Sequence, residues 1–113
     1  MHEMSLCESM LQIIQEQART RGYSKVLRIR LEIGALAGVE PGALRFGFEV
    51  VRRGTLAGEA ELDIIAIPGK AWCLICCETV NIMERFDACP KCGGVQLQTT
   101  AGHEMRIKDL EVE

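Results

Sequence analysis

The residues with the clearest chemical potential are two C-x-x-C pairs, Cys73 with Cys76 and Cys89 with Cys92. Each spacing places two sulfur atoms on the same side of a tight turn. Twelve residues separate the pairs, a distance that a short hairpin can span. Four thiolates brought together in this way form the tetrahedral sulfur set that structural Zn²⁺ prefers. The sequence therefore predicts a zinc site held by these four cysteines, closed to substrate and without catalytic activity.

Other uses of these cysteines are less well supported. Disulfides suit a secreted protein, but the N-terminus lacks the basic region and apolar core of a signal peptide, so we expect a cytoplasmic protein with reduced thiols. A redox pair is typical of a strand-to-helix junction in a thioredoxin-like unit, which neither pair occupies. One alternative stays open, because Cys77 directly follows the first pair and could replace Cys76 as a ligand.

Met1, His2 and Glu3 form a second candidate metal site. The amine of Met1, the amide nitrogen of His2 and the imidazole Nδ1 of His2 can close a five-membered and a six-membered chelate ring. Three nitrogens in one plane suit square-planar Ni²⁺ or Cu²⁺. The Glu3 amide, or a carboxylate from elsewhere, would complete the fourth position. Taken alone the pattern is weak, because an N-terminal Met-His is equally typical of a frayed chain end.

Composition narrows the function classes. The chain has 113 residues, a formal charge of −3, 48% hydrophobic residues and only five aromatic side chains. No apolar run approaches the roughly 18–20 residues of a membrane span. The mild acidity and the scarcity of aromatic residues disfavour nucleic-acid binding, which needs a basic face or stacking platforms.

Two helices are expected before the cysteines. Ser5 and Glu8 fit a capping box, and apolar residues at helical spacing continue to about Arg21. A second helix is predicted to begin at Glu40-Pro41, with proline at the first helical position.

Three strands are expected around these helices. Residues 25–33 alternate between apolar and charged side chains, which is typical of a half-buried strand. Residues 59–67 are richer in isoleucine, so we expect the more central strand there. Residues 103–112 complete the set. Together these elements predict an α+β fold, a small sheet backed by two helices, built from residues 1–67 plus 103–113, with residues 68–102 inserted as a zinc-ribbon-like module.

The motifs, taken together, resemble the HypA/HybF family of hydrogenase maturation factors, and the HybF-like branch in particular. The likeness covers essentially the whole chain in the same order, through the opening residues 1–7, the segments 31–36 and 39–40, both C-x-x-C pairs, and the last strand, residues 105–113. The combination is far more specific than either metal motif alone.

The resemblance implies a nickel metallochaperone, not an enzyme. It implies that His2 is the essential nickel ligand, with the backbone nitrogens of His2 and Glu3 beside it, and that Glu3 also helps to recognise a GTPase. Glu40 would be either a nickel ligand or a residue that contacts one. The four paired cysteines would hold structural zinc, whereas the role of His103 stays open. The departure from the family pattern is Cys77, a thiol next to a zinc ligand.

The implied partners are a HypB-type hydrogenase maturation GTPase and the large subunit of [NiFe]-hydrogenase, with no nucleic acid, no membrane insertion, and a monomer or weak homodimer. The alternative function is a zinc-ribbon module that binds protein or nucleic acid. A zinc hydrolase is disfavoured, because four cysteines leave no open position for water.

Overall fold

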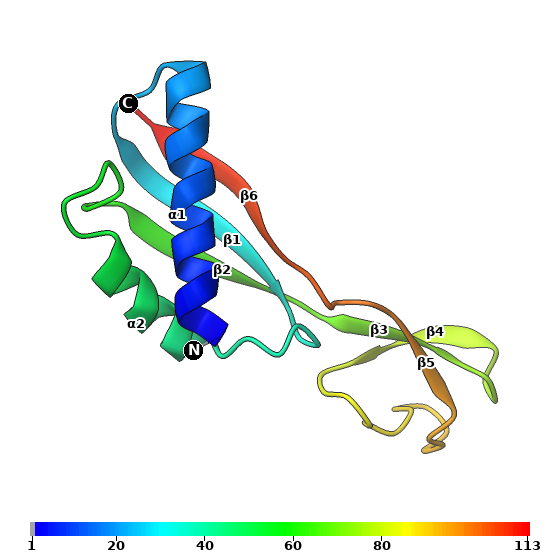
Figure 1. The fold of residues 1–113 in the computed structure, drawn as a ribbon. Coiled ribbons are helices and arrows are strands. Elements are labelled where there is room, and N and C mark those ends of the chain that lie inside the picture. The colour runs from blue at the N-terminus through cyan, green and yellow to red at the C-terminus, as the bar shows by residue number, and fades with distance from the viewer. Residues whose placement is uncertain (1) are drawn as a thin grey trace. The chain divides into compact units, whose positions relative to one another are not determined.

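The described residues form the predicted α+β fold, with two helices and two small sheets (Figure 1). The computed structural model describes residues 2–113, and for His2 it describes the backbone only. The elements, in chain order, are α1 (His2–Arg21), β1 (Val26–Gly34), α2 (Pro41–Val51), β2 (Glu61–Ile67), β3 (Gly69–Cys73), β4 (Glu78–Ile82), β5 (Leu97–Ala101) and β6 (Met105–Val112). Among the described helices, none is long and apolar enough to cross a membrane.

The residues form two compact units. The first unit contains the residues up to Leu31, Val39–Ile64 and Ile107–Glu113, and the second contains Glu32–Gly38 and Ile65–Arg106. The expected boundaries at residues 67/68 and 102/103 therefore differ from the ones observed. The segment Glu32–Gly38 belongs with the cysteines because Leu36, 4% exposed, packs in their apolar core. Whether residues 68–102 fold as a module by themselves stays a prediction.

The sheet that enters the first unit has the order β2-β1-β6, so β1 is its central strand. The expectation that residues 59–67 form the central strand was wrong. The expectation was based on isoleucine content, which does not follow burial here. The residues of β2 are only half-buried or exposed, whereas Ile29, Leu31 and Ile33 of β1 are buried. The alternation expected for β1 fails at its start, where Val26 is buried and Leu27 is 39% exposed.

Ion pairs join the central strand to both neighbours. The Arg28 guanidinium lies 2.7 Å from a carboxylate oxygen of Asp63 in β2. The Arg30 guanidinium lies 2.8 Å from a carboxylate oxygen of Asp109 and 2.7 Å from one of Glu111, both in β6. These partly exposed pairs each contribute little to stability. They do match charge across the strands, which favours this strand order over others.

The first helix begins earlier than predicted. Because α1 starts at His2, Ser5 lies inside the helix, and the predicted capping box was wrong. Glu3 in the first turn is favourable beside the positive end of the helix dipole. The other end was predicted correctly, since α1 ends at Arg21 and the Gly22 amide donates to the Ala18 carbonyl at 2.9 Å.

The second unit contains a three-stranded antiparallel sheet in the order β4-β3-β5. Its buried side chains form one cluster, namely Leu36, Ala71, Cys73, Val80, Ile82 and Cys89. Cys73 thus lies at once in a strand and in the core, which places the first cysteine pair at the end of the β3–β4 hairpin.

Candidate metal centres

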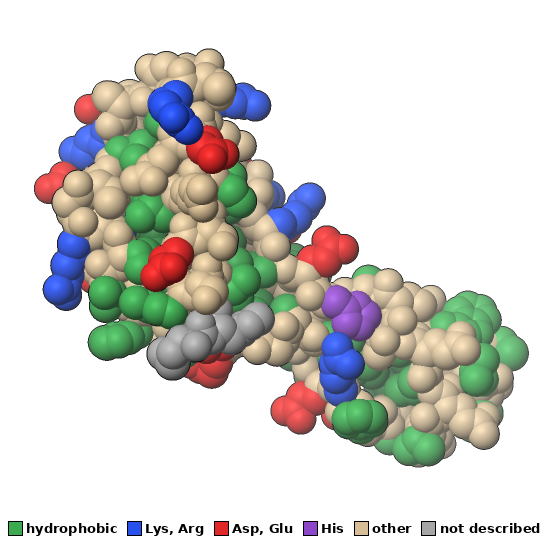
Figure 2. Space-filling model, viewed as in Figure 1, with side chains coloured by type: hydrophobic (Ala, Val, Ile, Leu, Met, Phe, Trp, Pro, Cys, Tyr) green, Lys and Arg blue, Asp and Glu red, His purple; other side chains and the backbone are tan. Residues whose placement is uncertain are grey.

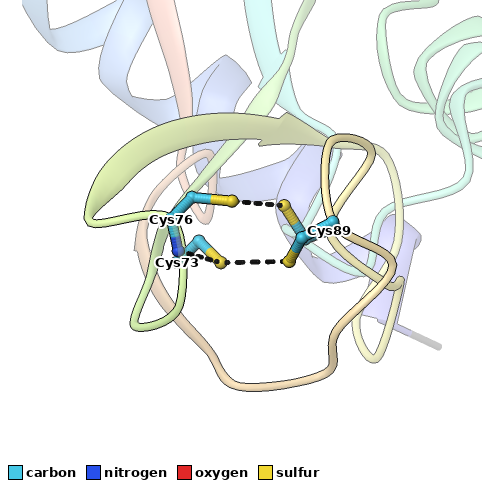
Figure 3. Close-up of side chains that lie close together, drawn as sticks. Cys73, Cys76 and Cys89 are labelled. Atoms are coloured by element: carbon cyan, nitrogen blue, oxygen red, sulfur yellow. Dashed lines mark hydrogen bonds between the residues drawn. The ribbon is translucent and has the colours of Figure 1, made fainter.

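The four paired cysteines converge on one point in the second unit. Their ligand sulfurs all lie within 4.8 Å of one another. The Cys73 Sγ to Cys92 Sγ distance is 3.7 Å, and the Cys76 Sγ to Cys89 Sγ distance is 4.0 Å. Figure 3 shows the sulfurs of Cys73, Cys76 and Cys89 directed toward the centre of the cluster. A tetrahedral ion with metal–sulfur bonds of about 2.3 Å places its sulfurs roughly 3.8 Å apart. The arrangement therefore fits a four-coordinate metal ion, and all six cysteines are free of disulfides.

Two similar turns hold the sulfurs. In the first, the Cys77 amide donates to the Cys73 carbonyl at 2.8 Å and the Cys76 amide donates to Cys73 Sγ at 3.4 Å. In the second, the Gly93 amide donates to the Cys89 carbonyl at 2.8 Å and the Gly94 amide donates to Cys92 Sγ at 3.4 Å. Amide hydrogens directed at sulfur favour the thiolate form, which is the form that binds a metal.

Burial makes a cation necessary if the sulfurs ionise. Cys73 is fully buried and Cys89 is 2% exposed, whereas Cys76 is half-buried and Cys92 is exposed. Sharing of protons raises the pKa of Cys76 to about 12, chiefly through its hydrogen bond with Cys92. The backbone amide of Cys92 is the main cause that lowers the pKa of Cys89 to about 7. Four thiolates this close repel one another without a cation, so metal binding and proton release are coupled here.

Cys77 does not join the cluster. Its side chain is exposed, and its Sγ lies 3.7 Å from the Leu74 carbonyl. Its φ of +55° is a left-handed conformation that favours glycine. Gly93, with φ of +73°, occupies the matching place after Cys92. The structure thus brings Cys76, and not Cys77, together with the other three sulfurs.

We expect Cys77→Gly to keep the metal and to leave the free energy of unfolding equal or higher by up to about 1 kcal/mol, because glycine relieves the left-handed backbone. Zinc content and a denaturant titration measure the two effects. The matched variant Cys76→Ser should lose the metal. Loss of metal from Cys77→Gly would instead make Cys77 a ligand.

The second candidate site falls mostly outside the described atoms. Met1 and the side chain of His2 lie outside the described residues, so the predicted amine and imidazole ligands stay predictions. The backbone is informative, since α1 begins at His2. The first amide hydrogens of a helix have no acceptor within it, so the amide nitrogens of His2 and Glu3 are available without loss of a helical hydrogen bond.

Two further candidates lie outside the cysteine group, which is the metal-binding group found among the described residues. Glu40 is exposed and caps α2, since its Oε2 accepts from the Ala43 amide at 2.6 Å. That contact explains an acidic residue before Pro41 without any metal. His103 is exposed and lies between β5 and β6 in the second unit.

Cys7 is not available as a soft ligand in this structure. It is fully buried in α1, and its Sγ donates to the Leu44 carbonyl at 3.3 Å. Burial raises the pKa of the Cys7 thiol, with a smaller contribution from Glu3. The thiol therefore stays protonated and packs as a small core residue.

Sequence reasoning missed one residue that shapes these regions. Gly47 was not noticed, although a glycine inside a helix is a signal of close packing. It is buried in α2 beside Cys7 and Met4 of α1.

The family model and the curated relatives that match this chain name the same family. Residues 1–112 match the family model described as "Hydrogenase/urease nickel incorporation, metallochaperone, hypA". The chain is 59% identical to the hydrogenase maturation factor HypA of Acidithiobacillus ferrooxidans and 58% identical to that of Alkalilimnicola ehrlichii, over 113 residues and the full length of each protein. The names of these relatives do not distinguish the HybF-like branch, which stays a prediction.

Two solved structures share the fold. One is the "Solution structure of the Ni metallochaperone HypA from Helicobacter pylori", with a TM-score of 0.68 and 26% identity over 97% of this chain and 96% of that one. The other is the "Solution structure of HypA protein", with a TM-score of 0.71 and 26% identity over 100% and 97% of the two chains. The family description is of a metallochaperone rather than of a catalyst.

Proposed function

The chain belongs to the HypA family of nickel-incorporation metallochaperones and hydrogenase maturation factors, and from this premise we propose that it carries Ni²⁺ at its own N-terminus. His2 is the essential ligand, the amide nitrogens of His2 and Glu3 are its neighbours, and the cargo is delivered to the large subunit of [NiFe]-hydrogenase. Cys73, Cys76, Cys89 and Cys92 hold a structural Zn²⁺. The match of the family model across residues 1–112 is the observation that carries the proposal.

The chemistry of the N-terminus supports nickel there. Nitrogen donors in a common plane suit square-planar Ni²⁺, and the first amides of α1 have no helical acceptor to give up. Release is equally feasible, because the donors lie on one chain end and can leave one at a time. Each amide nitrogen that leaves the metal takes up one proton.

The sulfur cluster supports a separate structural role. Four sulfurs fill every position of a tetrahedral ion, so no place is left for a cargo ligand or a water molecule. Two of the four lie in the core of the second unit. A metal held in this way stabilises the fold and is not exchanged readily. In this proposal the N-terminus binds the nickel cargo, and the four cysteines bind the structural zinc.

Protein partners are the third part of the proposal, namely a HypB-type maturation GTPase and the hydrogenase large subunit. Hydrophobic side chains gather on the surface of the second unit (Figure 2). Phe86 is 98% exposed, and Met83 is 63% exposed. Their loop is held by the Asp87 carboxylate, which accepts from the amides of Met83 and Glu84 at 3.1 and 3.0 Å. An exposed apolar group on an ordered loop supports contact with another protein.

The decisive test is nickel binding by the zinc-loaded protein. We expect one Ni²⁺ per wild-type chain and at least a roughly hundredfold weaker affinity in His2→Ala, because that variant loses the imidazole and one of the two chelate rings. Isothermal titration and absorption spectroscopy measure both quantities. Zinc content and the unfolding midpoint should not change.

An N-terminally extended chain is the matched control, since it removes the free amine and keeps every side chain. Weaker binding by this form would add the Met1 amine to the donors, whereas unchanged binding would assign the site to the amides, the imidazole and a carboxylate such as that of Glu40. If His2→Ala binds nickel as tightly as the wild type, the terminal site is wrong. The alternative would then hold, a zinc-stapled interaction module.

A further inference from the structure

The two helices of the first unit approach closely at Gly47. This residue is buried in the interior of α2, where glycine is unfavourable relative to alanine. A Cβ atom on it would lie 3.1 Å from Cys7 Sγ and 3.3 Å from Met4 Sδ, with the Glu3 carbonyl oxygen 3.8 Å away. All three atoms belong to the first two turns of α1. Glycine therefore leaves the space into which the start of α1 packs.

A hydrogen bond reinforces this contact. Cys7 Sγ donates to the carbonyl of Leu44, one turn before Gly47 in α2. The start of α1 is thus attached by a buried thiol and by the close approach of Met4 to Gly47. A helix end without such contacts unwinds readily, because its first amides have no helical partners.

The conformation of this first turn matters for chelation. Two successive amide nitrogens bind one metal through a five-membered ring, which needs the N–Cα–C–N torsion, ψ, to be close to zero. A helical ψ of about −42° lies near this value, whereas an extended ψ of about +135° directs the two nitrogens apart. A helical start at His2 therefore holds the amide nitrogens of His2 and Glu3 on the same side.

We propose that Gly47 is a positioning residue for the N-terminal nickel site: by admitting Met4 and Cys7 against α2, it keeps the first turn of α1 helical and its amide nitrogens preorganised for the metal. This inference rests on the proposed nickel function. Gly47 does not touch nickel. It acts through α1, by reducing the conformational freedom that the chelating residues lose on binding.

The test is Gly47→Ala, which adds one methyl group at the contact. We expect nickel affinity to fall about fivefold or more, since an unwound first turn must be refolded on binding. In the zinc-loaded, nickel-free protein, the amides of Leu6, Cys7 and Glu8 should exchange with solvent faster, because they donate to the carbonyls of residues 2–4. The absorption spectrum of bound nickel should keep its form at saturation, since the donors are the same.

Two variants separate positioning from general destabilisation. Val26→Ala removes buried volume from β1 just beyond the opposite end of α1, a helix about 30 Å long, and should lower the unfolding midpoint without weakening nickel. Cys7→Ala is the second: it leaves Gly47 in place but removes the thiol that attaches the start of α1 to the Leu44 carbonyl, so it should weaken nickel binding and speed the same amide exchange.

The outcomes are distinct. Wild-type nickel affinity in Gly47→Ala, or unchanged amide exchange, overturns the inference and leaves Gly47 as a packing residue only. Equal loss of affinity in Val26→Ala overturns it as well, because the effect would then follow stability. If His2→Ala shows that nickel does not bind at the N-terminus, the proposed function fails. Amide exchange of the zinc-loaded, nickel-free protein would still report whether Gly47 holds the first turn of α1.

Discussion

Replacing Cys73 by serine should release the metal of the second unit and unfold that unit. Cys73 is fully buried, and its sulfur is both a candidate ligand and part of a small core, for which the described residues supply six buried side chains and the partly buried Cys76 and Leu97. A core of this size cannot offset the entropy of ordering the unit without the metal. Structural zinc contributes about 10–16 kcal/mol to folding in small zinc-binding peptides, so loss of one ligand removes most of the stabilisation.

The measurement can use the single tryptophan of the chain. Trp72 is adjacent to Cys73 in β3, so its fluorescence reports on the second unit alone. We expect less than one zinc per chain and a red-shifted emission for Cys73→Ser. Cys77→Ser is the matched control, since it makes the same exchange at a cysteine outside the cluster. One tightly bound zinc and unchanged emission in Cys73→Ser would show that the cluster is not a structural metal site.

The cysteine cluster was predictable because its determinants are local. A C-x-x-C spacing fixes a turn, and two such turns separated by only twelve residues can readily bring their sulfurs together. The same holds for Glu40-Pro41 at the start of α2 and for the helix end at Arg21. Capping residues and short motif spacings determine helix ends and turns locally, so these features can be predicted without knowing the rest of the fold.

The strand order was not predictable in this way. Hydrophobic content suggested residues 59–67 as the central strand, whereas β1 pairs with both β2 and β6. Strand pairing brings together segments that are far apart in sequence, as the ion pair between Arg30 and Asp109 illustrates. The alternation of apolar and polar residues along one strand does not indicate which strands pair with it. Leu36 is a similar case, because a loop of small residues gives no sign that it belongs to the core around the cysteines.

Residue type alone could not decide the role of Glu40 either. A carboxylate before a proline suits a metal ligand and a helix cap equally, and here its oxygen accepts a hydrogen bond from the Ala43 amide.

The start of α1 was missed because Ser5 and Glu8 fit a capping box, although packing of Met4 beside Gly47 supports an earlier start. Tertiary contacts override such local signals.

Gly34→Ala should be the most damaging single substitution outside the cysteines. A Cβ atom at Gly34 would overlap the carbonyl of Gly102 and lie 2.9 Å from its Cα atom. Both sides of the contact are backbone, so no side chain can rotate away. The same backbone is held by hydrogen bonds of 2.8 Å, from the Gly34 amide to the Glu104 carbonyl and from the Leu36 amide to the Gly102 carbonyl. We expect a loss of about 4 kcal/mol or more in the free energy of unfolding.

Gly38→Ala is the matched control, since it makes the same change four residues later in the same unit. Gly38 has φ of +71° and open space around a Cβ atom, so the left-handed backbone alone should cost about 1–2 kcal/mol. Urea titrations followed by Trp72 fluorescence compare the two variants. A similar small loss at both positions would show that the Gly34 contact relaxes easily. A much larger loss at Gly34 would mean that Gly34, Gly69 and Gly102 form a rigid backbone crossing, in which a Cβ on Gly102 would lie 2.6 Å from the Gly69 Cα.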